Sequence, residues 1–206
     1  MILILKTGST LKSIKGPHGD FEDWIAGKLQ LSKSEYFVYS AGNYDTLPPD
    51  LTYTGIVITG SPLMVTDLKL NGSRLCNWLL DQQKDDVPIL GICFGHQLLT
   101  IINGGSVQNN DSGLVIGSQK TRLTSEGKGD DLFGHLPDIF HIYKTHSQSI
   151  QKSPKKSEIL SISESGIIDA IRFSNKCWGV QFHPEFNSNL MKLYIEDNKD
   201  ILISDG

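Results

Sequence analysis

The chain has 206 residues, of which 38% are hydrophobic and 20% charged, and its formal net charge is −4. This length suits one domain with a sizeable buried core, and the composition is that of a globular protein rather than a disordered one. The negative charge argues against a nucleic-acid binder, whose electrostatic footprint is basic.

The cysteine content and the N-terminus indicate the compartment. Three cysteines, at positions 76, 93 and 177, provide no disulfide framework and suit a reducing environment. Cys76 and Cys177 lie in apolar patterns without glycines, as buried structural cysteines do. The apolar run Met1–Lys6 is too short for a signal peptide or a membrane span and reads as a buried strand. We therefore expect a cytoplasmic protein that does not bind membranes.

Short apolar runs alternate with helical patterns in the first half of the chain. Strands are expected, in order, at Met1–Leu5, Tyr36–Tyr39, Gly55–Thr59 and Pro88–Ile92. Helices are expected between them at Phe21–Leu29 and Leu70–Lys84. The alternation predicts a largely parallel sheet with helices on both faces, and the continuous apolar runs suit its central strands.

The second half of the chain has a different pattern, in which extended runs follow one another without clear helices. These runs are Ser118–Thr124, Phe140–Tyr143, Ile159–Ser163, Ile167–Phe173 and Trp178–Phe182. They predict an antiparallel annex on the α/β core, followed by a last helix from about Ser188 to Ile203. Since no repeat, low-complexity tract or linker interrupts the chain, residues 1–206 are expected to form one domain.

The strongest chemical signal is the segment Pro88–Gln97, in which an apolar strand runs through Gly-Ile-Cys-Phe-Gly directly into a helical pattern. This is the nucleophile-elbow pattern with cysteine as its central residue. The turn is so sharp that its neighbours must be small, which explains Gly91 and Gly95. It places the Cys93 sulfur at a helix N-terminus, where the dipole favours the thiolate. The N–H of Phe94 is then placed to hold an oxyanion.

A second signal is Trp178–Glu185, an extended run that ends in His-Pro-Glu. A cysteine nucleophile needs a base that takes and returns a proton, and the base needs a partner that fixes its tautomer. His183 and Glu185 have the spacing for such a pair. A lone histidine at a strand end is more often structural, so this interpretation depends on the elbow at Cys93.

A third and weaker signal is Ile56–Pro62, an apolar strand that ends in Gly-Ser-Pro. The backbone N–H of Gly60 can complete an oxyanion hole, although an ordinary strand-to-loop turn has the same pattern.

Taken in this order, these segments resemble the class I glutamine amidotransferase family of the Cys-His-Glu type. The resemblance rests on Gly91–Gln97, on Gly179–Glu185, on the turn at Gly60 and on the stretch Lys144–Ser147, and it covers roughly the whole chain. It is nearest to stand-alone members similar to the glutaminase domain of GMP synthase. It implies a flavodoxin-like α/β fold and no cofactor or metal. One departure is Leu114–Gly117, where relatives often carry an acidic residue before Ile-Gly.

The resemblance implies a role for each matching position. Cys93 is the expected nucleophile, His183 the general base and acid, and Glu185 the residue that orients it. Gly60 and Phe94 are the expected oxyanion donors. Four further positions are expected to contact the substrate: Gln97, Thr145, His146 and Ser147. The implied reaction releases ammonia from glutamine, forms a γ-glutamyl thioester and hydrolyses it to glutamate.

Three functions remain open at this point. A glutaminase of this kind delivers ammonia to a synthetase, and since no ATP-binding signature occurs in the chain, the acceptor site is expected on a partner subunit. A γ-glutamyl peptidase or hydrolase would use the same three residues on a peptide such as glutathione and would need no partner. A catalytically silent binding or regulatory module is disfavoured, because Cys93, His183 and Glu185 are all present.

Overall fold

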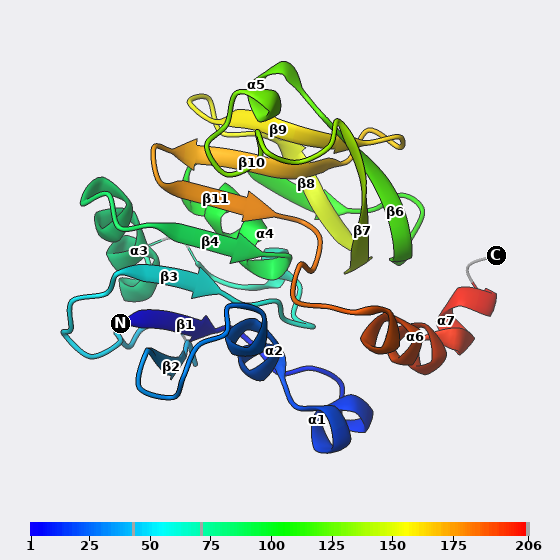
Figure 1. Ribbon diagram of the computed structural model, residues 1–206, viewed down its shortest axis with the longest axis horizontal. Helices are drawn as coiled ribbons and strands as arrows, with labels where there is room; N and C mark the ends of the chain where they lie inside the picture. Colours follow the sequence, from blue (N-terminus) through cyan, green and yellow to red (C-terminus); the bar gives the residue numbers. More distant parts are fainter. Residues whose placement is uncertain (43, 71, 205–206) are drawn as a thin grey trace.

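The computed structural model describes residues 1–42, 44–70 and 72–204 (Figure 1). Its strands are β1 (Ile2–Lys6), β2 (Tyr36–Ser40), β3 (Gly55–Ile58), β4 (Ile89–Ile92), β5 (Ser106–Asn109), β6 (Val115–Leu123), β7 (Ile139–His146), β8 (Gln148–Lys152), β9 (Glu158–Ser163), β10 (Ile168–Ser174) and β11 (Cys177–Val180). Its helices are α1 (Lys12–His18), α2 (Phe21–Lys28), the 3₁₀ turn η1 (Val65–Asp67), α3 (Arg74–Lys84), α4 (Phe94–Ile102), α5 (Ser125–Lys128), α6 (Ser188–Asp197) and α7 (Lys199–Ser204).

Nine strands form one sheet in the order β2-β1-β3-β4-β11-β10-β9-β6-β7. The first five are parallel to one another. When these five are numbered along the chain, their order is 2-1-3-4-5, which is the flavodoxin-like arrangement. The predicted fold class is therefore confirmed.

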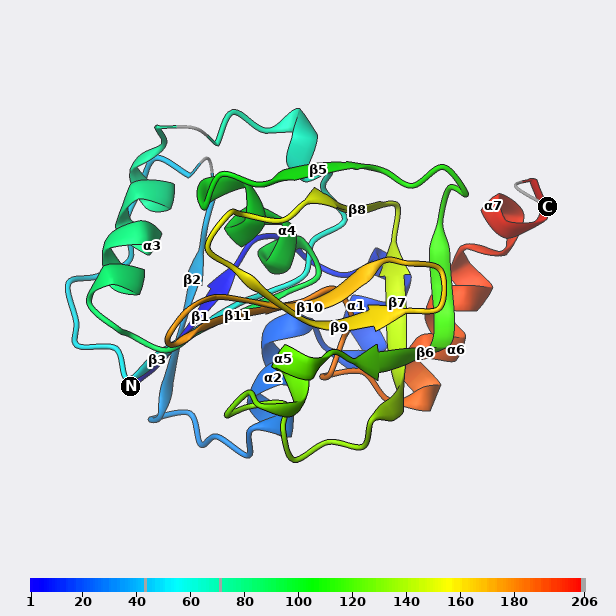
Figure 2. The same cartoon turned by 90° about the horizontal axis from the view of Figure 1, so that it is seen from above.

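Helices cover both faces of the parallel strands, as Figure 2 shows with α3 and α4 on one side and α2 on the other. Successive side chains of a strand point to opposite faces. In β1, Leu3 and Leu5 accordingly belong to the core that includes Leu75 of α3 and Leu98 of α4. Ile4 between them belongs to a second core that includes Ile25 of α2 and continues under the annex.

The annex is a continuation of the main sheet rather than a separate layer. Strands β10, β9, β6 and β7 extend the sheet with antiparallel pairing, while β5 and β8 form a small antiparallel sheet of their own. The run Trp178–Phe182 was expected in the annex, but β11 pairs in parallel with β4 and is the fifth core strand. The same strand pairs antiparallel with β10 and so joins the two parts.

Two predicted helices differ from the observed ones at their boundaries. The helix expected over Leu70–Lys84 begins at Arg74, because the Ser73 hydroxyl caps it by accepting a hydrogen bond from the Cys76 N–H at 3.3 Å. The predicted start includes Asn71, which lies outside the described residues. The helix expected over Ser188–Ile203 is two helices, α6 and α7, that meet at Asn198.

Candidate active site

Cys93 lies at the turn between β4 and α4, with φ 49° and ψ −99°. A side chain at Gly91 would place its Cβ 2.5 Å from the carbonyl oxygen of Gly95, and one at Gly95 would lie 2.6 Å from the carbonyl oxygen of Ile58. Both contacts are too close for any residue but glycine. The two glycines of the motif thus allow the sharp turn, and the strained cysteine is held at the first turn of α4, as the elbow pattern predicts.

His183 lies three residues beyond the end of β11, in the segment that leads to α6. Its backbone N–H donates to the carbonyl of Tyr143 at 2.8 Å, and its ring stacks on Phe186 with the centroids 4.3 Å apart. The distance from Nδ1 to Glu185 Oε1 is 2.7 Å, and both side chains are only 2% exposed. The predicted contact between His183 and Glu185 is therefore formed. The strand before it is shorter than expected, since β11 ends at Val180 rather than at Phe182.

The electrostatics of His183 are set by its two neighbours. Burial lowers the pKa of His183, but the Glu185 carboxylate and then the Cys93 sulfur raise it more, to about 10. Nε2 is buried and has no hydrogen-bond partner of ordinary length among the described residues. Because the imidazole is charged at neutral pH, it can stabilise a thiolate at Cys93.

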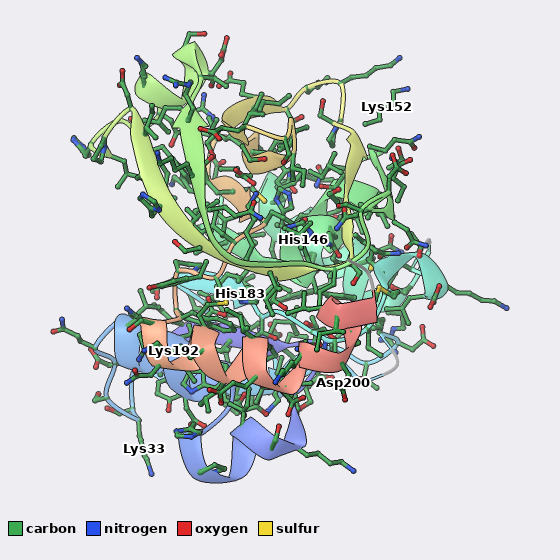
Figure 3. All side chains as sticks on the ribbon, turned by 90° about the vertical axis from the view of Figure 1, so that its right-hand side faces the viewer. Lys33, His146, Lys152, His183, Lys192 and Asp200 are labelled. Atoms are coloured by element: carbon green, nitrogen blue, oxygen red, sulfur yellow. The ribbon has the colours of Figure 1, made fainter. Side chains whose placement is uncertain are left out.

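The Cys93 sulfur is 3.6 Å from the carbonyl oxygen of Thr145, and the Gln181 side-chain amide donates toward it, also at 3.6 Å. It opens on a cavity of about 270 Å³ whose wall also includes His183. All four predicted substrate contacts line this cavity: Gln97, Thr145, His146 and Ser147. Residues from α6 and α7 reach the same cavity, and Figure 3 shows these helices on the opposite side of His183 from His146.

The two predicted oxyanion donors flank the site. Phe94 is the first residue of α4 after Cys93. A Cβ at Gly60 would lie 2.9 Å from His183 Cε1, so this glycine lies directly against the imidazole. In the described part of the chain, neither the Gly60 N–H nor the Phe94 N–H donates to a protein acceptor. The two groups are thus available to a bound molecule.

Several side chains around the cavity were not predicted from the sequence. The Gln181 carbonyl oxygen Oε1 accepts from Gln97 Nε2 at 3.2 Å, and Gln97 Nε2 also donates to the Gln148 backbone carbonyl at 2.7 Å. Tyr194 of α6 lines the cavity and shares a 2.5 Å hydrogen bond with the Thr10 hydroxyl. Gln181 lies in the motif Gly179–Glu185, in which the sequence pattern indicated a role only for His183 and Glu185. No sequence pattern around Gln148 or Tyr194 indicates that either residue lines the site.

Leu114, where the chain departs from the family pattern, also lines the cavity. Within the described ranges, no three His, Cys, Asp or Glu side chains converge in a way that could hold a metal ion. In the same part of the chain, every helix is too short or too polar to cross a lipid bilayer.

Comparison with known proteins identifies relatives of two kinds. Gamma-glutamyl peptidase 5 of Arabidopsis thaliana is 33% identical over 68% of this chain and 56% of its own length. A glutamine-hydrolyzing GMP synthase subunit of Methanocaldococcus jannaschii is 32% identical over 64% of this chain and 64% of that protein. In GMP synthase of Porphyromonas gingivalis strain W83, the match spans only 27% of the relative. The chain thus corresponds to about half of the plant peptidase and a quarter of that longer synthase.

Solved structures show the same fold. A glutamine amidotransferase from Thermotoga maritima superposes with a TM-score of 0.74 at 21% identity, over 99% of this chain and 84% of that one. A putative GMP synthase subunit from Thermoplasma acidophilum gives a TM-score of 0.68 at 18% identity, over 97% and 98% of the two chains. The family model "Glutamine amidotransferase class-I" matches residues 28–201. The chain therefore belongs to the class I glutamine amidotransferase family.

Proposed function

We propose that this chain is a glutaminase of the amidotransferase type, which hydrolyses the side-chain amide of glutamine through a γ-glutamyl thioester on Cys93. The observation that carries the proposal is that Cys93 and His183 line one cavity while Glu185 pairs with His183 from behind, 2.7 Å from its Nδ1, and helps raise the pKa of His183 to about 10. A charged imidazole beside a cysteine at a helix N-terminus is the arrangement that activates a thiolate nucleophile.

The reaction follows from these positions. The Cys93 thiolate attacks the amide carbon, and the carbonyl oxygen becomes an oxyanion that the N–H groups of Phe94 and Gly60 stabilise. His183 then protonates the amide nitrogen, the C–N bond breaks, and ammonia leaves. A water molecule gives its proton to His183 and attacks the thioester, which releases glutamate and the thiolate. Glu185 orients the imidazole throughout and keeps the proton on Nδ1 while the ring is neutral.

The proposed substrate contacts are neutral groups. Burial, and then the positive charge of Lys144, lower the pKa of His146 to about 3, so its imidazole is uncharged at neutral pH. Nδ1 lies 2.9 Å from the Gln148 carbonyl oxygen, which assigns the proton to Nδ1. Nε2 has no partner among the described residues and can accept a hydrogen bond from a ligand. We propose that Gln97, Thr145 and Ser147 complete this side of the substrate site.

We further propose that ammonia passes to a synthetase on a separate polypeptide, and that the protein works in the cytoplasm. Relatives named as single subunits of GMP synthase support a division of the two activities between two chains. The continuous sheet from β2 to β7 supports one domain over residues 1–206. Such a glutaminase is expected to be slow alone, since a single misplaced oxyanion donor costs about 10²–10³ in rate.

A second candidate function is a γ-glutamyl peptidase, in which an amine leaves in place of ammonia. The match to the plant γ-glutamyl peptidase favours it. The test measures kcat/KM of the purified chain for glutamine and for glutathione, by glutamate, ammonia and cysteinylglycine release, with Cys93→Ala as the blank. Slow glutamine hydrolysis without glutathione cleavage supports the glutaminase. Fast glutathione cleavage would show that the chain is a γ-glutamyl peptidase. Fast glutamine hydrolysis would contradict control of the glutaminase by a partner. If neither substrate is turned over, the remaining hypothesis is a catalytically silent binding module.

A further inference from the structure

Lys144 of β7 and Asp169 of β10 form an ion pair in the interior of the protein. The distance from Nζ to Oδ1 is 2.5 Å, and both side chains are 0% exposed. The two strands are not neighbours, since β9 and β6 lie between them in the sheet. The pair is therefore a direct link across the curved annex, between strands that the backbone ladder connects only indirectly.

Each of these residues lies in a backbone segment that holds the candidate active site. Lys144 stands between Tyr143, whose carbonyl accepts from the His183 N–H at 2.8 Å, and Thr145, whose carbonyl is 3.6 Å from the Cys93 sulfur. In Figure 1 the end of β7 accordingly lies beside the segment that follows β11. Strand β7 thus contacts both the imidazole-bearing segment and the nucleophile.

The partner strand reaches the same sulfur by another route. The carbonyl of Asp169 accepts a hydrogen bond from the Gln181 N–H at 2.8 Å. The Gln181 side chain in turn lies 3.6 Å from the Cys93 sulfur and accepts from Gln97. The backbones on the two sides of the ion pair therefore hold the segment Gln181–His183 between them.

We propose that Lys144 and Asp169 are positioning residues, whose ion pair sets the spacing between β7 and β10 and thereby the position of His183 relative to the Cys93 sulfur. The inference rests on the glutaminase or γ-glutamyl hydrolase activity proposed above. Stability alone gives no reason for the pair, because removing two charges from water costs several kcal/mol per ion and an apolar pair of similar volume is often as stable. A role in spacing the two strands does explain the pair, since an error of about 1 Å in a reacting geometry can cost about 10²-fold in rate.

The test compares the double variant Lys144→Met/Asp169→Val with the wild type. Each single substitution should lower both the melting temperature and kcat, because it leaves one buried charge unpaired. The double variant should recover the melting temperature, while its kcat stays about 10- to 100-fold below wild type with KM changed little. Recovery of kcat to within about twofold would show that the pair is only structural. Arg172→Met is the matched control: it removes ion pairs with Glu158 and with the buried Asp130 from the same strand β10. Neither acid lines the cavity, so its kcat should remain that of wild type.

A second variant guards against failure to fold. Asp169→Glu keeps both charges but lengthens the link by one methylene, so kcat should fall about fivefold or more. Unchanged kcat in Asp169→Glu would also overturn the inference. Alkylation of Cys93 by iodoacetamide at pH 7, followed by mass spectrometry, needs no substrate and should slow in both variants. If the wild type turns over neither glutamine nor glutathione, the proposed function fails but the alkylation rates still test the positioning pair.

Discussion

Replacing Glu185 by glutamine keeps the shape of the side chain but removes its charge from the contact with His183. The wild-type hydrogen bond is 2.7 Å long and both side chains are 2% exposed. A hydrogen bond to a charged group contributes about 1.5–3 kcal/mol. Since about 1.4 kcal/mol is tenfold in rate, its loss should lower kcat about 10- to 150-fold. The pKa of His183 should fall from about 10, because the carboxylate is its largest raising influence.

The assay measures kcat by glutamate release at pH 7 for Glu185→Gln, His183→Ala and wild type. His183→Ala should be the more damaging of the two, since it removes the proton carrier itself rather than the group that orients it. Glu158→Gln is the control, because this carboxylate lies in an exposed ion pair with Arg172. Wild-type activity in Glu185→Gln, or a loss greater than that in His183→Ala, would refute the assigned roles.

Three further predictions use the same site. Cys93→Ser should abolish turnover and the thioester adduct seen by mass spectrometry while leaving the melting curve unchanged. Its control is Cys76→Ala, at a buried position outside the site, which should keep wild-type kcat and cost about 1 kcal/mol of stability. Substantial turnover by Cys93→Ser would contradict the covalent mechanism. Gly60→Ala places a Cβ 2.9 Å from His183 Cε1 and should lower kcat about 10²-fold with little change in melting temperature; full activity would mean that this turn plays no part. Folding raises the pKa of His183, so the stabilisation that its charge provides is complete below about pH 6.5 and is lost as the pH rises toward 10. In urea unfolding, the free energy of unfolding of wild type should therefore exceed that of Glu185→Gln by an amount that shrinks across this pH range. A difference that stays constant would contradict the prediction.

Much of the fold is predictable because its strands carry a local signal. The four apolar runs before Cys93 were each found as parallel strands within one or two residues of their expected bounds. The short elements were not predicted: α1, with glycine and proline inside it, and the polar strands β5 and β8 have no periodicity that marks them. The parallel pairing of β11 was also missed, because a short run has the same pattern whether its neighbour is parallel or antiparallel.

The elbow and the residues around it could be identified without coordinates. The Gly-x-Cys-x-Gly pattern and the His-Pro-Glu spacing are both contained in short stretches of sequence. The contact that requires glycine at position 91 is also local, whereas the one at position 95 is with Ile58 of β3. The surroundings of the Cys93 sulfur, by contrast, emerge only in the folded chain. The buried pair of Lys144 and Asp169 joins two strands that are separated in the sheet by two others. Lys144 and Asp169 meet because the annex is curved, and this curvature depends on long-range packing that no short sequence window contains.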